Sequence, residues 1–329
     1  MEYVLITGGC GYIGSHISVV LLQNNYNIII IDNLCNSDIS TLENIKEITG
    51  KTPLFFNINL LDIQSLNTIF KEYTISTVIH TAGYKSVPES VKNPIKYYEN
   101  NVITTINLIK CMNENHCNKL IFSSSYCVYE TTDSDLNEYM PVSTGINSYG
   151  NTKYLIEKML DDIELNIICL RYFNPIGSHS SGLIGEPINL STGIMSFIIK
   201  TALGINDCLN ISTDINGNSA TRDFLHVEDL AEAHIKTLEY IKINPCKNIK
   251  INICSGKKTQ IIDLLKIFEK VNNMEIFYKK GVCRPGDVHY IVGDPTKAFK
   301  LLGWRAKIKI EDMCKSSWNY AVNKYINFI

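Results

Sequence analysis

The amino-acid sequence predicts an α/β protein built on a doubly wound parallel sheet, with a smaller α/β lobe at its C-terminal end. Three observations lead to this prediction. Short apolar, β-branched segments alternate with helical segments in the first half of the chain, a glycine-rich turn follows the first apolar segment, and the alternation ends after Phe173. Buried parallel strands are continuous hydrophobic runs, and strands that alternate with helices form right-handed β-α-β units within one sheet.

The predicted strands of the main sheet are the apolar runs at residues 3–6, 27–31, 53–56, 77–79, 119–122 and 166–170. Beyond Phe173, a loop rich in glycine, serine and proline precedes a predicted helix at 194–203, and short strands and helices follow. We therefore expect residues 1–173 to form the first domain and residues 174–329 the second lobe. Two segments near 224–254, namely 224–227 and 249–253, are candidates to return to the main sheet.

Composition limits the possible partners. With 329 residues, of which 45% are hydrophobic, the chain can bury a large core and is expected to be soluble and globular. The net charge of −2 provides no general basic field for nucleic acid or an anionic membrane, so the partners should be small molecules or proteins. The eleven cysteines are odd in number and lack close C-x-x-C pairs, which favours reduced thiols in the cytoplasm, and no metal site is expected. The first residues run directly into a strand pattern, so we expect neither a targeting segment nor a membrane span.

The first strand ends in the turn TGGCGYIGSH, in which Gly8, Gly11 and Gly14 stand between a strand and a helix. A dinucleotide-binding turn needs such glycines, because the chain must turn tightly, approach a pyrophosphate and pack the helix on the strand. The second strand ends at Asp32, whose carboxylate can accept hydrogen bonds from both ribose hydroxyls and would repel a 2′-phosphate. The pattern favours a Rossmann-type NAD site over an NADP site, and over a turn that binds no ligand.

Several further blocks resemble one family. The glycine spacing, the serine run 123–125 and the pair Tyr149 and Lys153 are similar to the extended short-chain dehydrogenases/reductases. Within that superfamily the chain resembles the UDP-galactose 4-epimerases (UDP-glucose 4-epimerases) nearly end to end. The matching blocks are TGGCGYIGSH, DNLCNS (32–37), VIHTAGYKSVPESV (78–91), YYENNV (97–102), FSSSYCVY (122–129), SYGNTK (148–153), LRYFNPIGSHSSGLIGE (170–186), RDFLHVEDLAEAH (222–234), RPGD (284–287) and LGW (302–304). The resemblance implies NAD as cofactor, a UDP-hexose as substrate and a homodimer.

The catalytic candidates are Ser125, Tyr149 and Lys153. Asn147 and Ser148 are good N-caps, so Tyr149 should begin a helix with Lys153 one turn further on the same face, while Ser125 ends a strand at the ligand-binding edge of the sheet. Alone, such a Tyr–Lys pair would more often lie on a solvated surface. A phenol with a pKa of about 10 needs nearby positive charge to act as a base at neutral pH. By resemblance, Tyr149 takes the proton from the sugar 4-hydroxyl, directly or through Ser125, while the C4 hydride passes to bound NAD.

The resemblance also implies the residues of the two binding sites. The expected cofactor-binding residues are Gly8, Gly11, Tyr12, Ile13, Gly14, Asp32, Asn33, Asn36, Ser37, Asn59, Leu60, Thr81, Ala82, Gly83, Lys85, Asn100, Ser123, Tyr149, Lys153 and Tyr172. The expected substrate-binding residues are Lys85, Ser125, Cys127, Tyr149, Phe173, Asn174, Gly193, Ser212, Arg222, Arg284 and Asp287. Arginine suits the diphosphate end, because its planar fork can hold two phosphate oxygens.

Several positions depart from the family pattern. Asn59 replaces an Asp at the adenine end, Cys127 replaces a Thr beside the sugar, and Gly193 replaces an Asn at the diphosphate. Ser212 stands where an aromatic residue is expected against uracil, and Ile291 stands where relatives carry either a bulky Tyr or a smaller residue. The departures concern the nucleotide sugar more than the hydride chemistry, and Ile291 predicts some tolerance of N-acetylhexosamines.

The predicted function is therefore the NAD-dependent epimerisation of UDP-galactose and UDP-glucose at C4, through a transient 4-keto sugar. Two alternatives remain open: another nucleotide-sugar epimerase or oxidoreductase of the same superfamily, and a non-catalytic NAD-binding protein. Dehydration is disfavoured, because Tyr126 and Cys127 stand where the related dehydratases carry an acid. The altered uridine contacts favour a non-catalytic protein, whereas the intact Ser125, Tyr149 and Lys153 favour an enzyme.

Overall fold

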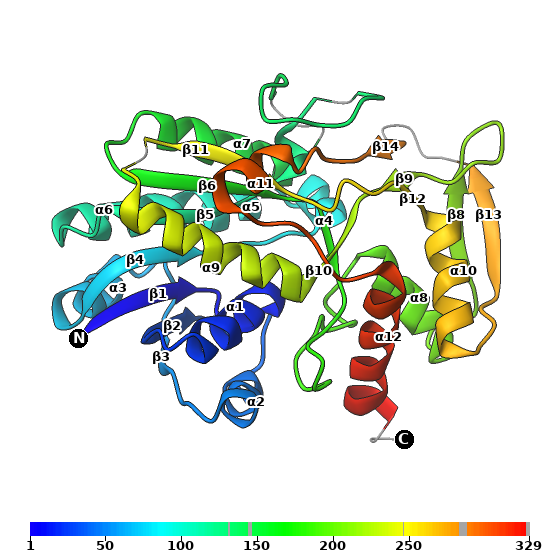
Figure 1. The fold of residues 1–329 in the computed structure, drawn as a ribbon, viewed down its shortest axis with the longest axis horizontal. Helices are drawn as coiled ribbons and strands as arrows, with labels where there is room; N and C mark the ends of the chain where they lie inside the picture. The colour runs from blue at the N-terminus through cyan, green and yellow to red at the C-terminus, as the bar shows by residue number, and fades with distance from the viewer. Residues whose placement is uncertain (131, 144–146, 246, 283–287, 327–329) are drawn as a thin grey trace.

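The computed structural model describes residues 1–130, 132–143, 147–245, 247–282 and 288–326. A seven-stranded sheet in the order β11-β6-β5-β4-β1-β2-β3 runs through the larger part of the molecule (Figure 1). Every pairing in it is parallel. Its strands are β1 (Glu2–Thr7), β2 (Ile28–Asp32), β3 (Leu54–Asn57), β4 (Thr74–His80), β5 (Lys119–Ser125), β6 (Asn166–Tyr172) and β11 (Ile249–Ile253). The doubly wound order confirms the predicted fold class.

Helices cover both faces of this sheet. One face packs on α1 (Tyr12–Gln23), α2 (Ser40–Thr49), α9 (Val227–Ile243) and α11 (Thr296–Leu302), and the other on α3 (Ile63–Glu72), α6 (Thr104–Glu114) and α7 (Ser148–Asp161). In β1, Val4 and Ile6 belong to the core of the first face, whereas Leu5 belongs to the core of the second. Because successive side chains of a strand point to opposite faces, covering both faces explains why the strands are apolar throughout.

The segment between β4 and α6 contains α4 (Val87–Lys92), α5 (Pro94–Tyr97) and the π-helix η1 (Tyr98–Ile103). A short 3₁₀-helix, η2 (Tyr126–Val128), follows β5 directly. π-Helical turns are rare and often occur at functional sites. Both irregular turns lie next to carboxyl ends of the central strands β4 and β5.

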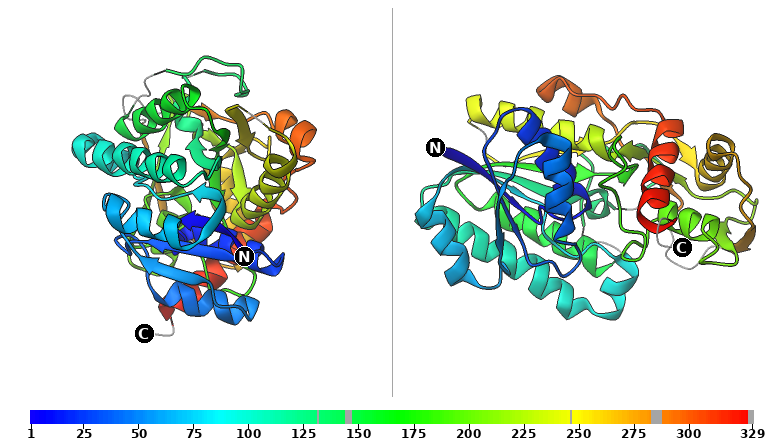
Figure 2. Two further views of the ribbon diagram at one scale, coloured as in Figure 1. Left: turned by 90° about the vertical axis from the view of Figure 1, so that its left-hand side faces the viewer. Right: turned by 90° about the horizontal axis from the view of Figure 1, so that it is seen from below.

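A second cluster of elements forms the smaller lobe, which lies at one end of the long axis of the molecule (Figure 2). Its apolar core draws on α8 (Ile194–Ala202), α10 (Ile261–Asn272), α12 (Ile310–Ala321) and the parallel pair β8 (Leu209–Thr213) and β13 (Tyr278–Val282). The remaining elements are β7 (Asn174–Ile176), β9 (Thr221–Arg222), β10 (Phe224–His226), β12 (Thr259–Gln260), β14 (Tyr290–Ile291) and the π-helix η3 (Val322–Ile326).

The two segments proposed to return to the main sheet behave differently. Residues Ile249–Ile253 form β11, which pairs with β6 at the edge of the main sheet. Residues Phe224–His226 form β10, which pairs with β7 in a separate two-stranded sheet. The prediction for this second segment was wrong, because a three-residue strand carries too little pattern to specify its partner.

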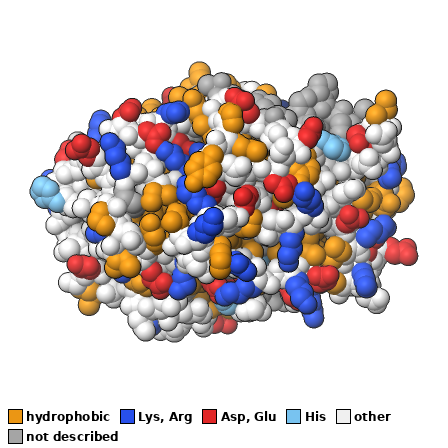
Figure 3. Space-filling view, turned by 45° about the horizontal axis from the view of Figure 1, so that its top comes forward, with side chains coloured by type: hydrophobic (Ala, Val, Ile, Leu, Met, Phe, Trp, Pro, Cys, Tyr) orange, Lys and Arg blue, Asp and Glu red, His pale blue; other side chains and the backbone are white. Residues whose placement is uncertain are grey.

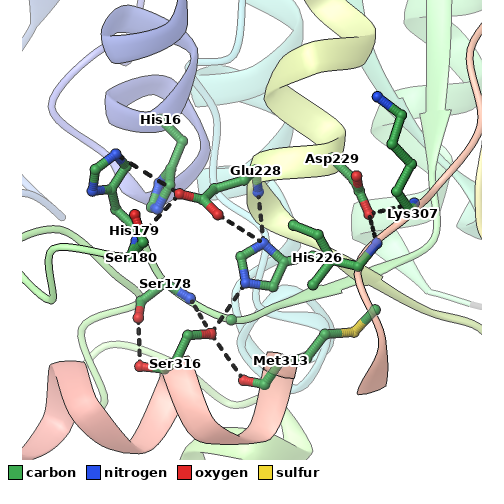
Figure 4. Close-up of polar contacts among 12 residues, drawn as sticks. His16, Ser178, His179, Ser180, His226, Glu228, Asp229, Lys307, Met313 and Ser316 are labelled. Atoms are coloured by element: carbon green, nitrogen blue, oxygen red, sulfur yellow. Dashed lines mark hydrogen bonds and ion pairs between the residues drawn. The ribbon is translucent and has the colours of Figure 1, made fainter. Parts of the chain in front are cut away.

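Polar contacts join the two lobes around the start of α9 (Figure 4). The backbone N–H of Glu228 donates to Nδ1 of His226 at 3.1 Å, so Nε2 of His226 carries the proton and lies 3.1 Å from the Ser316 hydroxyl on α12. The Ser316 hydroxyl also accepts from the backbone N–H of Ser178 at 3.2 Å. The neighbouring Asp229 carboxylate accepts from the backbone N–H of Lys307 at 3.0 Å. These bonds fix the loop after β7 against α9 and α12.

On the face drawn in Figure 3, acidic and basic side chains are interspersed, in keeping with the net charge of −2. Across the part of the chain that the structure describes, no helix has both the length and the hydropathy needed to cross a bilayer.

Candidate active site

The glycine turn between β1 and α1 forms one wall of a pocket at the carboxyl edge of the main sheet. Gly8 has a φ of 70°, in the left-handed region, and a Cβ on Gly14 would lie 2.2 Å from the carbonyl oxygen of Gly8. Only glycine fits both positions. Gly8, Gly11, Tyr12, Ile13 and Gly14 all line the pocket. The turn thus presents backbone and the amino end of α1 to the pocket, which fits a pyrophosphate.

Asp32 lies at the end of β2 and lines the same pocket. Its carboxylate accepts from the backbone N–H groups of Cys10 at 3.0 Å and Leu34 at 2.9 Å, and from the Ser37 hydroxyl at 2.9 Å. These bonds hold the carboxylate in one orientation at the pocket wall. The other predicted residues at this end also line the pocket: Asn33, Asn36, Ser37, Asn59 and Leu60.

The third wall follows β4 and contains Thr81, Ala82, Gly83, Lys85 and Asn100, five of the expected cofactor-binding residues. Asn101, in the π-helix, holds this wall in place. Its Oδ1 accepts from the backbone N–H of Tyr84 at 2.8 Å, and its Nδ2 donates to the Tyr84 carbonyl and to the Thr152 hydroxyl, both at 3.1 Å. Since Thr152 lies between Tyr149 and Lys153 on α7, the side chain of Asn101 ties α7 to the pocket wall.

The three catalytic candidates lie together beside this pocket. The Asn147 side chain caps α7 by accepting from the backbone N–H of Gly150 at 2.8 Å, so Tyr149 and Lys153 lie one turn apart at the start of the helix. The Ser125 hydroxyl accepts from the backbone N–H of Cys127 at 3.2 Å. Burial raises the pKa of the Tyr149 phenol well above its usual value, and a hydrogen bond with Ser125 opposes this rise.

Lys153 is 5% exposed and its ammonium donates to the carbonyl oxygen of Ser123 at 2.7 Å. Burial lowers the pKa of Lys153 to about 8, and the nearby Glu157 carboxylate acts in the opposite direction. The amine is therefore mainly charged at neutral pH, but with little margin. Lys153 follows Tyr149 by one turn of α7, and a cation near a phenol favours the phenolate form that a base needs.

Ser123 and Tyr172, both predicted to face the cofactor, share a buried hydrogen-bond chain. The Tyr172 hydroxyl lies 2.6 Å from the Ser123 hydroxyl and 2.7 Å from Nε2 of His234. Nδ1 of His234 lies 2.9 Å from the Leu230 carbonyl, so Nδ1 carries the proton and Nε2 accepts from Tyr172. These hydrogen bonds join Ser123 on β5 and Tyr172 on β6 to His234 on α9.

The predicted substrate residues are less closely grouped. Phe173 is buried, and the Asn174 side chain donates to the Asp223 carbonyl at 2.9 Å. The Arg222 guanidinium donates to the carbonyls of Thr221 at 2.9 Å and Val288 at 2.8 Å. Arg284 and Asp287 lie outside the described residues. Asn174 and Arg222 therefore both donate to main-chain carbonyls in this structure.

The positions that depart from the family pattern have distinct surroundings. Gly193 is the N-cap of α8, and a Cβ there would make ordinary contacts, 3.5 Å from the Ser191 hydroxyl and 3.9 Å from the Glu186 carboxylate. Ser212 lies on β8 opposite Gly281, in the smaller lobe. Ile291 is buried in the apolar cluster that contains Phe173, and Cys127 is half-buried beside Ser125.

Sequence reasoning missed one wall of the pocket and the packing of Tyr126. Glu186, Pro187, Leu190 and Ser191 line the pocket from the loop before α8, and Lys85 forms an ion pair with Glu186 at 2.6 Å. Only the GLIGE block pointed to this loop. Tyr126 packs on Phe173 with ring centroids 5.6 Å apart. Burial raises the pKa of Tyr126, the charge of Arg222 acts to lower it, and the phenol of Tyr149 acts to raise it.

Comparison with known proteins agrees with this geometry. The sequence profile of the family described as GDP-mannose 4,6 dehydratase matches residues 5–317. The UDP-glucose 4-epimerase of Bacillus subtilis is 40% identical over 327 residues, which cover 96% of each chain. The crystal structure of UDP-glucose-4-epimerase from Stenotrophomonas maltophila, with bound NAD and formylated UDP-arabinopyranose, has a TM-score of 0.95 at 33% identity and covers 99% of this chain and 100% of that one.

A second structure, UDP-glucose 4-epimerase from Bifidobacterium longum in complex with NAD⁺ and UDP, has a TM-score of 0.91 at 35% identity and covers 98% of both chains. These matches extend over nearly the full length of this chain and of each relative. The chain therefore belongs to the UDP-glucose 4-epimerase family of the extended short-chain dehydrogenases/reductases.

Proposed function

We propose that this protein interconverts UDP-galactose and UDP-glucose by NAD-dependent epimerisation at C4. One observation supports this proposal above the others, namely the placement of the three catalytic candidates. Tyr149 and Lys153 lie one turn apart on α7, and Tyr149 shares a hydrogen bond with Ser125. The Lys153 ammonium would lie 3.9 Å from a Cβ on Gly83, which lines the same pocket as the glycine turn and Asp32. The pocket fits NAD, because the glycine turn and the start of α1 line it and Asp32 lies at its wall, where a ribose would be bound.

In the proposed mechanism, the side chains of this protein remove a proton from the sugar and later return it. NAD, when bound, would accept the C4 hydride as the 4-hydroxyl loses its proton, would return that hydride to the opposite face of C4, and would add a positive charge to the site. Tyr149 takes the proton of the sugar 4-hydroxyl, directly or through Ser125, and Lys153 favours the phenolate form by its charge. The 4-keto sugar then turns its other face toward the cofactor. Tyr149 returns the proton to the oxygen at C4, whose configuration is now inverted.

The nucleotide end of the substrate should lie between the two lobes. We assign residues 1–173 to cofactor binding and residues 174–329 to the nucleotide sugar, apart from α9, α11 and β11, which pack on the main sheet. Asn174, Gly193 and Arg222 are the proposed contacts on the described part of the smaller lobe. Asn174 and Arg222 would exchange main-chain carbonyls for diphosphate oxygens, which accept stronger, charge-assisted hydrogen bonds.

We also propose a homodimer. Val91, Ile95, Ile103 and Leu155 are exposed large apolar side chains on α4, α5, η1 and α7, and α7 packs against each of the other three elements. Ile95 alone is 71% exposed. Apolar side chains gathered on neighbouring helices indicate a protein contact. Light scattering after size exclusion should give twice the chain mass, and Ile95→Glu should give a monomer; a monomeric wild-type protein would rule the dimer out.

The protein should act in the cytoplasm on a nucleotide sugar, without nucleic acid, which the net charge of −2 supports. Imaging of a fluorescent fusion tests the location, and signal confined to an organelle or the cell surface would contradict it.

One assay tests the function. Purified protein is incubated with UDP-galactose without added NAD, and the nucleotide sugars are separated by chromatography. UDP-glucose should appear without a net rise in absorbance at 340 nm, and Tyr149→Phe should abolish this product while NAD stays bound. Unchanged substrate in the presence of added NAD would favour a non-catalytic protein. Accumulation of NADH would favour a nucleotide-sugar oxidoreductase.

A further inference from the structure

A buried ion pair joins the helix that carries Tyr149 and Lys153 to strand β6. Glu157 on α7 and Arg171 on β6 are each 3% exposed. Arg171 donates from Nε to Oε1 of Glu157 at 3.0 Å and from Nη2 to Oε2 at 2.6 Å. This two-bond geometry holds the carboxylate of Glu157 in one orientation.

The same carboxylate also binds the strand that carries Ser125. The Ser124 hydroxyl donates to Oε1 of Glu157 at 2.5 Å, and Ser124 lies opposite Arg171 in the pairing of β5 and β6. Glu157 therefore links the catalytic helix to two adjacent strands. Removing the carboxylate would free both the Ser124 side chain and the guanidinium.

Stability alone does not explain this pair. A buried ion pair often contributes no more to stability than apolar side chains of the same size, because both charges lose their hydration. Here the guanidinium is also incompletely satisfied, since its buried Nη1 has no hydrogen-bond partner among the described residues. The placement of a negative charge at this point needs another reason.

Besides Arg171, the cation that the charge of Glu157 stabilises is Lys153. On the helix, Glu157 lies four residues after Lys153 and eight after Tyr149, about 6 Å and 12 Å along the axis. The other titratable groups around the amine are His80 on β4, whose pKa burial and Lys153 lower, and Cys169 on β6. Arg171, also on β6, shares the carboxylate of Glu157, so one negative charge faces two cations.

We propose that Glu157 is a positioning residue for the epimerase reaction: its carboxylate keeps Lys153 in the ammonium form and, through Ser124, fixes the strand end that carries Ser125. The inference rests on the proposed function. Burial pulls the pKa of Lys153 down to about 8, and the charge of Glu157 is the first opposing influence. Without that charge, Lys153 loses its proton at a lower pH, and the phenolate of Tyr149 loses its stabilising cation.

The variant Glu157→Gln keeps the shape of the side chain and an oxygen that can accept from Ser124, but removes the charge. The acidic limb of the kcat/KM profile, which reports formation of the phenolate, should move about one unit to higher pH. Activity at pH 7 should then fall about tenfold. Removing Glu157 also removes its direct repulsion of the phenolate, which by itself would lower the pKa of Tyr149. This effect is the smaller one, because Glu157 is farther from Tyr149 than from Lys153.

Unpaired Arg171 could prevent the single variant from folding, so a double variant, Glu157→Gln with Arg171→Met, carries the same test. Replacing both charges of a buried pair is commonly neutral for stability. The double variant should shift the acidic limb in the same direction. The matched control is Glu239→Gln, which removes a carboxylate from an exposed helical ion pair with Lys236 and should leave the profile unchanged.

A second readout does not depend on activity. The absorbance at 295 nm, titrated against pH and compared with a Tyr149→Phe background, gives the pKa of Tyr149, which should rise in both variants. An unshifted profile and an unshifted phenol in either folded variant would overturn the inference, even if kcat falls, because that result describes a purely structural pair. A wild-type protein without epimerase activity would instead contradict the proposed function.

Discussion

The glycine turn gives the sharpest structural prediction, namely that Gly14→Ala loses NAD. A Cβ on Gly14 would lie 2.2 Å from the carbonyl oxygen of Gly8 and 2.8 Å from Cα of Gly9. Both are main-chain atoms, so no side-chain rotation relieves the contact. Gly8 is itself fixed, because its N–H donates to the carbonyl of Ile31 at 2.7 Å and its carbonyl accepts from Gly11 at 3.1 Å. The methyl group must therefore push α1 away from β1 by about 1 Å, beyond what a packed interior tolerates without strain.

Two consequences follow from that displacement. Overpacking of this kind costs about 3 kcal/mol of folding free energy, so the melting temperature should fall by several degrees. The amide groups at the start of α1 should also move out of reach of the pyrophosphate. Loss of two charge-assisted hydrogen bonds, each contributing about 1.5 kcal/mol, weakens NAD binding roughly 100-fold.

The assay is the amount of NAD released by acid from the purified, desalted protein, together with a thermal melt. Gly281→Ala is the matched control, because a Cβ on Gly281 would meet nothing within 4 Å. The control should keep its NAD and its melting temperature. If Gly14→Ala also keeps a full complement of NAD, the argument that this turn approaches the cofactor is refuted.

Three further predictions follow from the structure. Gly193→Asn places a favoured N-cap residue at α8, where there is room for it, and returns an amide to the diphosphate end, so the KM for UDP-galactose should fall about tenfold; an unchanged KM would place the diphosphate elsewhere. Tyr126→Ala removes a ring packed on Phe173, so the kcat/KM for a UDP-N-acetylhexosamine should rise relative to UDP-galactose, whereas Tyr126→Phe should keep the wild-type ratio; equal ratios in all three proteins would remove Tyr126 from the sugar site. Burial lowers the pKa of His16 to about 3, below its value of about 6.5 in the unfolded chain, so the unfolded state takes up the proton first and stability falls as pH falls from about 6.5 toward 3. In urea unfolding, His16→Gln should therefore reduce the pH slope of the free energy of unfolding by about 1.4 kcal/mol per unit in this window, while the exposed control His116→Asn should not; equal slopes would contradict the assignment.

The sequence predicted the main sheet well, because its signals are local and repeated. Every predicted strand of the sheet is present, within a few residues of its expected ends. Asn147 caps the catalytic helix as expected, and Gly8, Gly14 and Asp32 lie on one pocket. These residues lie at turns and strand ends, where backbone geometry limits the choice of residue.

Other features depend on contacts between distant segments and could not be derived from local pattern. The partner of β10, the wall formed by Glu186 and the chain that joins Tyr172 to His234 all depend on how the smaller lobe packs on the sheet. The buried pair of Glu157 and Arg171 joins residues on different elements that no spacing rule connects. Such features become predictable only once the sheet order is known.

The central claim is that the hydrogen at C4 leaves the sugar and returns to it within one active site. The most direct test is to incubate the protein with UDP-galactose carrying deuterium at C4, in ordinary water and without added NAD, and to analyse the UDP-glucose formed by mass spectrometry and NMR. The account predicts that the product keeps its deuterium at C4. UDP-glucose that has lost the label to solvent, or that forms only when NAD is added at each turnover, would contradict it.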